Sequence, residues 1–265
     1  MLRYFRICHN LLVRMGVSGE DVLSIEGDRW IVSIDVRNYR ICFECKVPTS
    51  RWPYRRCGKF IGRVVKWGSL RHIKNADGVY ALQRYITKWS RDLGKVFPSL
   101  VNDLIYYLKL FDESRCNLLY AEPLALGISL MIKYFSELSR ADVITYVPLH
   151  QSELRLFRVI SGEERLVNHV YEIAKMVSGH VGKPLINALV KVRPLRMSKL
   201  NNVARRFCEV KELYKPRERA DLRGLRVILI DDIITTGATM NECARVLKEC
   251  LGAEKVYAVV AGVSY

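Results

Sequence analysis

The sequence predicts an α/β protein with a mostly parallel β-sheet that is flanked by helices. One observation is the apolar runs in "DVITYVPL" and "LRVILIDD", which are typical of strands buried on both faces. Another is the spacing of apolar residues by three and four in longer segments, which favours helices with one buried face. Strands and helices also alternate in the C-terminal part of the chain, and this order favours parallel pairing.

The character of the chain changes near residue 75. Before that point, "RWIVSIDV" and "GRVVKWGSL" alternate in part, as short strands do. Residues 1–75 are therefore expected to form a small β-rich N-terminal module. Residues 76–265 are expected to form the larger α/β domain, and a chain of 265 residues is long enough for both cores.

The elements of the larger domain follow from periodicity. Residues 78–97 and 99–111 are expected to be helices because their apolar residues recur at helical spacing. The apolar segment 141–150 is expected to be a strand that ends at Pro148. The remaining expected elements are a helix from about 163 to 178, a short apolar stretch at 184–192, a strand at 225–232, a helix from about 239 to 250 and a strand at 255–263.

The charge balance limits the partners. The chain carries 43 Lys and Arg against 27 Asp and Glu, a formal net charge of +16. This excess favours nucleic acid, phosphorylated small molecules or acidic surfaces. No apolar run has the length of a membrane span, and the N-terminus lacks the ordered regions of a signal peptide. A cytoplasmic protein without a membrane partner is expected.

The stretch "VILIDDIITTGAT", residues 227–239, carries the functional prediction. Its apolar run predicts a central strand, so Asp231 and Asp232 emerge at the carboxyl end, where ligands bind in such sheets. Two adjacent carboxylates are poor core residues because burying unpaired charge is costly. They are better explained as groups that meet hydroxyls or a metal ion.

The residues after the two acids favour a phosphate site. Small and hydroxyl-bearing side chains form a turn that enters a helix, where backbone N–H groups and the helix dipole attract an anion. Gly237 allows close approach of the backbone or a positive φ, and threonine hydroxyls add donors. The residues of this turn are Thr235, Thr236, Gly237, Ala238 and Thr239.

This combination resembles the signature of the type I phosphoribosyltransferases: four apolar residues, two acids, a variable pair and a TTG-type loop. In that family the acids meet the ribose 2- and 3-hydroxyls of phosphoribosyl pyrophosphate (PRPP), and the loop holds its 5-phosphate. The resemblance implies a phosphoribosyltransferase-type sheet and Mg²⁺-dependent transfer of a phosphoribosyl group to a nitrogenous base or amine. By this match Asp231 and Asp232 act in catalysis and residues 235–239 bind PRPP.

A second resemblance points to the ComF/GntX branch of that family. "VITYVPLH", a basic stretch through Arg155 and Arg158, and "ERLVNHVYEIAKMV" are similar to the branch's "PVPLH", arginines and "RGFNQ" helix. The match puts Arg165 and Asn168 on the arginine and asparagine of "RGFNQ", with His169 in place of the glutamine. The resemblance implies that these residues lie on the pyrophosphate side of the substrate, while a solvated face is the alternative for the arginines.

The N-terminal cysteines favour a structural zinc ion. Cys42 and Cys45 form a CxxC pair whose spacing suits one tetrahedral Zn²⁺, and Cys57 follows in "RRCGK". Cys8, His9 or His72 would complete the set, with Cys8 as the candidate fourth ligand. Buried thiols are the alternative, or a disulfide if the cytoplasm is that of a hyperthermophile. The cysteines at 116, 208, 243 and 250 lie in or near expected helices and are predicted to be core residues.

Two other functions stay open at this point. ComF-like proteins are associated with DNA uptake and recombination, so a non-catalytic nucleic-acid-binding protein is one alternative. Its support is the positive charge, the histidine in place of the branch glutamine and "RWPYRR", which interleaves aromatic and basic residues as binders of single-stranded DNA do. The alternative for "RWPYRR" is a loop that packs one aromatic residue onto the small domain. A regulator that senses PRPP or a nucleotide without turnover is the other. The resemblance alone also leads us to expect a homodimer.

Overall fold

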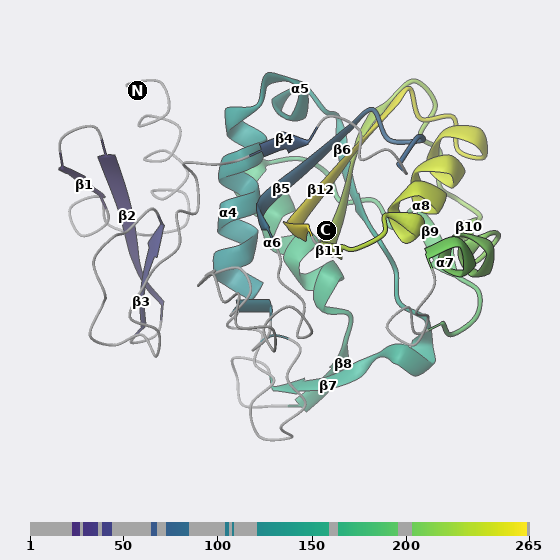
Figure 1. Ribbon diagram of the computed structural model, residues 1–265, viewed down its shortest axis with the longest axis horizontal. Coiled ribbons are helices and arrows are strands. Elements are labelled where there is room, and N and C mark those ends of the chain that lie inside the picture. The colour runs from purple at the N-terminus through teal and green to yellow at the C-terminus, as the bar shows by residue number, and fades with distance from the viewer. Residues whose placement is uncertain are drawn as a thin grey trace.

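The computed structural model describes residues 23–26, 29–36, 39–43, 65–67, 73–84, 104–105, 108, 121–158, 164–195 and 203–263. Its centre is a five-stranded sheet in the order β4-β5-β12-β11-β6 (Figure 1). Neighbouring strands run parallel except β4, which is antiparallel to β5. The predicted mostly parallel sheet is therefore confirmed. Its strands are β4 (Val65–Trp67), β5 (Gly78–Arg84), β6 (Val143–Tyr146), β11 (Arg226–Ile234) and β12 (Lys255–Val263).

Helices cover both faces of this sheet, as Figure 1 shows. Helices α4 (Ala121–Tyr134) and α6 (His169–Val181) pack together on one face, and α8 (Ala238–Glu249) packs on the other. The short helices are α5 (Ser136–Ser139), α7 (Val203–Val210) and the 3₁₀ turn η2 (Gln151–Glu153). Two strand pairs complete the domain: the hairpin β7 (Arg155–Arg158) with β8 (Glu164–Val167), and β9 (Leu189–Lys191) with β10 (Tyr214–Pro216).

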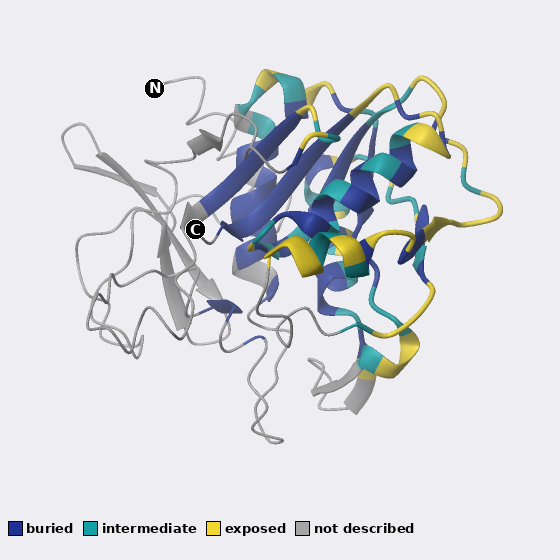
Figure 2. Ribbon diagram, turned by 45° about the vertical axis from the view of Figure 1, so that its right-hand side comes forward, coloured by how far each residue is buried: buried dark blue, intermediate teal, exposed yellow. Residues whose placement is uncertain are grey.

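Each central strand supplies side chains to two separate cores. Along β11, Ile228 and Ile230 pack into the core beneath α4 and α6, whereas Val227 and Leu229 pack into the core beneath α8. Figure 2 shows the sheet buried between the helical layers. This alternation explains why the strands read as uninterrupted apolar runs, because a strand covered on both faces has no solvent-facing position.

The chain from β11 through α8 to β12 forms a βαβ unit with parallel neighbours. Ile230 lies opposite Val259 of β12 and Tyr146 of β6. The three strands therefore end along the same edge of the sheet. That edge places Asp231 and Asp232 beside the segment that follows β6.

The expected helix at residues 78–97 is wrong at its start, because residues 78–84 form β5. Strand β5 pairs in parallel with β12. Its residues alternate between the two cores, with Tyr80 and Leu82 in one and Val79 and Ala81 in the other. A short apolar run of this kind fits a buried strand as well as a helix, and here the tertiary context decides.

The helix expected from about residue 163 also begins too early. Residues 164–167 form β8 of a hairpin, and α6 begins at His169. The Asn168 side chain accepts hydrogen bonds from the backbone N–H groups of Val170 and Tyr171, at 3.0 and 3.3 Å. An N-cap of this kind fixes the start of a helix. Asn168 is therefore the physical reason for the later start.

The predicted burial of the C-terminal cysteines is correct for one residue only. Cys243 is fully buried beneath α8, whereas Cys208 and Cys250 are exposed. Cys250 is the C-cap of α8, just past its last residue, and most residues of α7, Cys208 included, are exposed or partly exposed. Cys116 lies outside the described residues.

The N-terminal part contains a three-stranded antiparallel sheet. It consists of β1 (Leu23–Glu26), β2 (Arg29–Val36) and β3 (Tyr39–Phe43). Cys42 lies on β3 opposite Ser33, and only its backbone is described. Cys8, Cys45 and Cys57 lie outside the described residues, as does "RWPYRR", so the zinc site stays a prediction. The boundary at residue 75 also stays a prediction, although β4 already pairs into the central sheet.

Among the residues that the structure describes, no helix combines the length and the hydropathy needed to cross a membrane.

Candidate functional site

The two acids near the carboxyl end of β11, which continues to Ile234 rather than ending at Asp232 as expected, contact different layers of the fold. Asp232 is almost fully buried and is hydrogen-bonded to His169 on α6. Asp231 is half-buried and lies close to Cys243 of α8, where burial raises the pKa of the thiol and the charge of Asp231 raises it further. The backbone N–H of Asp232 donates to Asp231 Oδ1 at 2.8 Å. Asp232 thus faces α6 on one side of the sheet, and Asp231 faces α8 on the other.

The partner of Asp232 comes from the first residue of α6. The His169 Nε2 atom lies 2.5 Å from Asp232 Oδ2, and both side chains are about nine-tenths buried. Hydrogen bonds that involve a charged group are shorter and stronger than neutral ones. In the sequence, His169 stands out only as a departure from the branch pattern. The sequence alone does not reveal this pair because the two residues lie far apart along the chain.

Gly237 shapes the loop that follows β11. It is the N-cap of α8 with φ 81°, in the left-handed region that L side chains rarely adopt. A Cβ atom at this position would lie 2.5 Å from Ile73 Cγ1. The N-cap therefore offers no side-chain acceptor to α8, and Ala238 N donates to Thr236 Oγ1 at 3.4 Å. Such a helix start has the donors and the dipole to hold a phosphate.

Hydrogen bonds between α8 and residues 74–75 hold Ile73 against Gly237. The Asn241 Oδ1 atom on α8 accepts hydrogen bonds from the backbone N–H groups of Lys74 and Asn75, at 2.8 and 3.1 Å. The Asn75 side chain donates back to the Asn241 carbonyl at 3.2 Å. The loop at Gly237 is thus packed against the Ile73 side chain. Nothing in the sequence pattern around Ile73 indicates this contact.

The threonines of the loop have different surroundings. Thr235 is exposed, and Arg206 of α7 donates from Nη1 to its hydroxyl at 3.4 Å. Thr239 is hydrogen-bonded to Tyr214, whose side chain is buried beneath α8. Burial raises the pKa of Tyr214, and the nearby Cys243 and Asp231 raise it further. Tyr214 therefore stays neutral and supports the loop from below.

Cys243 does not fit the role of a nucleophile. It is fully buried, and burial raises the pKa of its thiol. The thiolate is the reactive form, so a thiol of this kind is inert. Cys243 packs the α8 core under Asp231.

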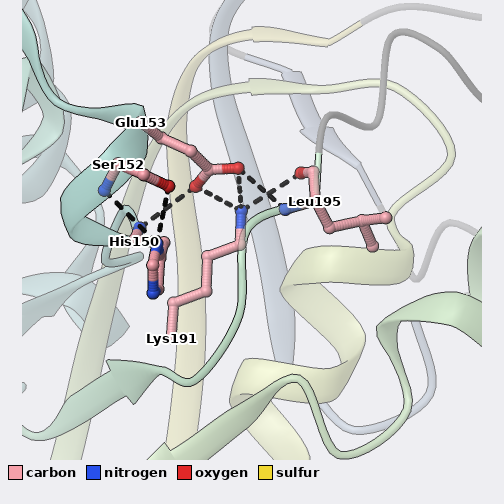
Figure 3. A network of polar contacts seen from close by, with 5 residues as sticks. All are labelled: His150, Ser152, Glu153, Lys191 and Leu195. Atoms are coloured by element: carbon pink, nitrogen blue, oxygen red, sulfur yellow. Dashed lines mark hydrogen bonds and ion pairs between the residues drawn. The ribbon is translucent and has the colours of Figure 1, made fainter.

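A buried polar network, shown in Figure 3, joins the segment after β6 to the segment after β9. The Lys191 ammonium donates to both oxygens of Glu153, at 2.9 and 2.6 Å, and to the Leu195 carbonyl at 3.2 Å. Glu153 also accepts from the backbone N–H groups of His150 and Leu195. Burial alone would raise the pKa of Glu153, but these hydrogen bonds outweigh it and lower the pKa. The network fixes two loops at the strand edge that carries the acids.

The other predicted residues lie on the hairpin before α6. Arg155 and Arg158 are on β7 and Arg165 is on β8, and the structure describes only their backbones. Asn168 lies at the helix start, where its Oδ1 atom caps α6. A role for these four residues on the pyrophosphate side stays a prediction. The structure brings Asp231, Asp232 and residues 235–239 together at one strand end.

Comparison with protein families gives a match for this part of the chain. The phosphoribosyl transferase domain matches residues 191–261, from the end of β9 to β12, and includes both acids and the loop. The match thus covers β11, α8 and most of β12, and the structure itself confirms the expected mostly parallel sheet flanked by helices.

Two curated relatives are named ribose-phosphate pyrophosphokinase. The one from Sulfolobus acidocaldarius is 29% identical over 157 residues, which is 55% of this chain and 52% of the relative. The one from Saccharolobus solfataricus is 27% identical over 186 residues, which is 65% of this chain and 60% of the relative. The chain thus spans little more than half the length of the relatives that it matches. The ComF/GntX resemblance stays a prediction.

Among solved structures, glutamine PRPP amidotransferase from B. subtilis, complexed with ADP and GMP, is similar to the chain at 21% identity. The TM-score is 0.37, and the match covers 61% of this chain and 30% of the other.

Proposed function

We propose that this phosphoribosyltransferase-type domain binds PRPP at residues 231–239 and transfers its phosphoribosyl group to a nitrogen of a base or amine. One observation carries the proposal: two acids near the end of β11 precede, by a short loop, a helix N-terminus whose N-cap is a glycine of positive φ. A carboxylate accepts hydrogen bonds from hydroxyls, and a helix N-terminus binds an anion. The site therefore suits a ribose that carries a 5-phosphate.

Each group has a role in the proposed reaction. Asp231 and Asp232 accept hydrogen bonds from the ribose hydroxyls, and the first N–H groups of α8 hold the 5-phosphate. The bond between C1 and pyrophosphate breaks and a C1–nitrogen bond forms, while the nitrogen gives up a proton. The transition state is oxocarbenium-like, so the protein contributes positioning and charge rather than a covalent nucleophile.

The acids also suit the Mg²⁺ that the fold family implies. Mg²⁺ is typically bound by one or two carboxylates together with substrate phosphates. Within the described residues, no group of three or more His, Cys, Asp or Glu side chains is arranged to hold a metal ion. Asp231 and Asp232 fit a metal that is held largely by its substrate. When bound, Mg²⁺ supplies charge that stabilises the departing pyrophosphate.

The names of the two curated relatives support a second candidate, the transfer of pyrophosphate to a ribose phosphate. This candidate uses the same ligand group, because a ribose phosphate also offers a 5-phosphate and neighbouring hydroxyls. It differs from the first proposal in the co-substrate. A nucleoside triphosphate would have to occupy the site beside the acids.

We expect the purified chain to release pyrophosphate from PRPP only when Mg²⁺ and a nitrogenous acceptor are both present. The measurement is pyrophosphate release across a panel of bases and amines, with a parallel reaction of ATP and ribose 5-phosphate. The variant Asp231→Asn with Asp232→Asn is expected to be inactive because each neutral amide lacks the negative charge of the carboxylate and offers the ribose hydroxyls one acceptor oxygen in place of two. Activity that persists in this variant would contradict the assignment.

Other outcomes would favour the alternatives. PRPP binding without turnover would favour a sensor. Affinity for single-stranded DNA that falls steeply with salt, without PRPP binding, would favour a nucleic-acid-binding protein, because release of counterions makes such binding salt-dependent. Turnover of ATP and ribose 5-phosphate would favour the second candidate.

A further inference from the structure

The contact between His169 and Asp232 is a buried hydrogen bond whose donor can be assigned. Nε2 and Oδ2 are 2.5 Å apart, and the exposed fractions of the two residues are 8% and 6%. An ionised carboxylate offers only acceptors, so with Asp232 as the ribose acceptor in its ionised form the imidazole donates from Nε2. His169 therefore donates to one oxygen of an acid that the proposed function assigns to the ribose.

His169 reaches this position on a rigid element. It is the first residue of α6, directly after the Asn168 cap, and α6 packs against β6, β11 and α4. The helix start is fixed by three hydrogen bonds to Asn168: two to its side chain, and one from Glu172 N to its carbonyl at 3.1 Å. A side chain presented in this way holds its partner within a narrow range of orientations.

From this geometry we infer that His169 is a positioning residue for ribose recognition. It holds the Asp232 carboxylate in one orientation, so that the acid meets a ribose hydroxyl without reorganising when the ligand binds. The inference rests on the proposed function and deepens it, because it assigns to the ribose subsite a residue outside residues 231–239. A preorganised acceptor loses less freedom on binding and so binds more tightly.

The test separates orientation of Asp232 from packing of α6. His169→Gln keeps a side-chain N–H donor of similar reach, whereas His169→Asn is too short and His169→Leu has no donor. His180 is a matched control on the same helix: it is half-buried, and its Nδ1 atom is hydrogen-bonded to Ser129 Oγ at 3.1 Å. His180→Leu therefore removes a comparable contact at the far end of α6.

The readouts are PRPP affinity by calorimetry and the melting temperature of each variant. We expect His169→Gln to keep most of the wild-type affinity. His169→Asn and His169→Leu should bind roughly ten- to a hundredfold more weakly, the range seen when a group that orients a ligating side chain is lost in metal sites. His180→Leu should lower the melting temperature and leave the affinity unchanged.

Three results would overturn the inference. If His169→Gln binds as weakly as His169→Leu, the hydrogen bond is not what matters. If both disrupting variants fold and keep full affinity, or if His180→Leu weakens binding equally, His169 has no specific role at the ribose subsite. A wild-type chain that binds no PRPP would overturn the proposed function as well, and the wild-type titration alone distinguishes that case.

Discussion

Gly237→Ala is expected to destabilise the fold by about 2–5 kcal/mol, since an L residue in the left-handed region costs roughly 1–2 kcal/mol and overpacking adds about 1–3. The reason lies in two properties of one position: φ is 81°, and a Cβ atom would lie 2.5 Å from Ile73 Cγ1 and 2.7 Å from its Cδ1. PRPP affinity should fall with stability because the same backbone forms the phosphate loop. Thermal or urea unfolding and calorimetry measure the two effects.

Gly224 supplies the matched control for this substitution. It has nearly the same φ, 72°, but a Cβ atom there would have no neighbouring atom within 4 Å. Gly224→Ala therefore carries only the backbone cost and should leave PRPP affinity unchanged. In an Ile73→Ala background, where the contact is absent, Gly237→Ala should cost only the backbone part relative to Ile73→Ala alone. Equal losses in both alanine variants would show that contact with Ile73 contributes nothing.

Lys191→Met is expected to cost about 3–5 kcal/mol, the usual penalty for leaving one charge of a buried ion pair without its partner. The exposed fraction of the Lys191 side chain is 5% and that of Glu153 is 10%. Glu153→Gln should be costly for the converse reason, because it leaves the ammonium buried. The double variant should cost much less than the sum of the two, since coupled groups are non-additive. Chemical denaturation of the four proteins measures this cycle.

The acid dependence of stability provides a check on the same pair. The pKa of Glu153 is lowered in the folded chain, so its contribution is present above the carboxyl's ordinary pKa and is lost as pH falls through the folded value. The variant Glu153→Gln with Lys191→Met should lack this pH-dependent part of the free energy of unfolding. Asp221→Asn, in the exposed pair with Arg223, is the control and should change stability little. Strict additivity of the two single variants would contradict the coupling.

The central strands and the loop could be predicted because their signals are local. An apolar run such as Val227 to Ile230 has one interpretation when two carboxylates and a glycine loop follow it. The same reasoning failed at Gly78 to Arg84, where a short apolar run precedes a longer segment of helical spacing. Local periodicity does not distinguish these cases. Residues 78–84 form a strand because they pair in parallel with β12.

The contacts that support the site could not be predicted because they join distant residues. His169 meets Asp232, and Glu153 meets Lys191, only once the helices and loops have packed on the sheet. Ile73 reaches Gly237 through Asn241 in the same way. One sequence cannot reveal such pairs. It can indicate that polar residues like Asp232 need partners, since an unpaired buried charge is costly.

Calorimetric titration with PRPP, with and without Mg²⁺, tests most directly whether the two acids hold a phosphoribosyl group. We predict saturable binding that Mg²⁺ strengthens. Binding should weaken by about a hundredfold or more in Asp231→Asn with Asp232→Asn, since each hydrogen bond to a charged group contributes about 1.5–3 kcal/mol. No binding by the wild-type chain, or an affinity unchanged in the double variant, would contradict this role of the acids.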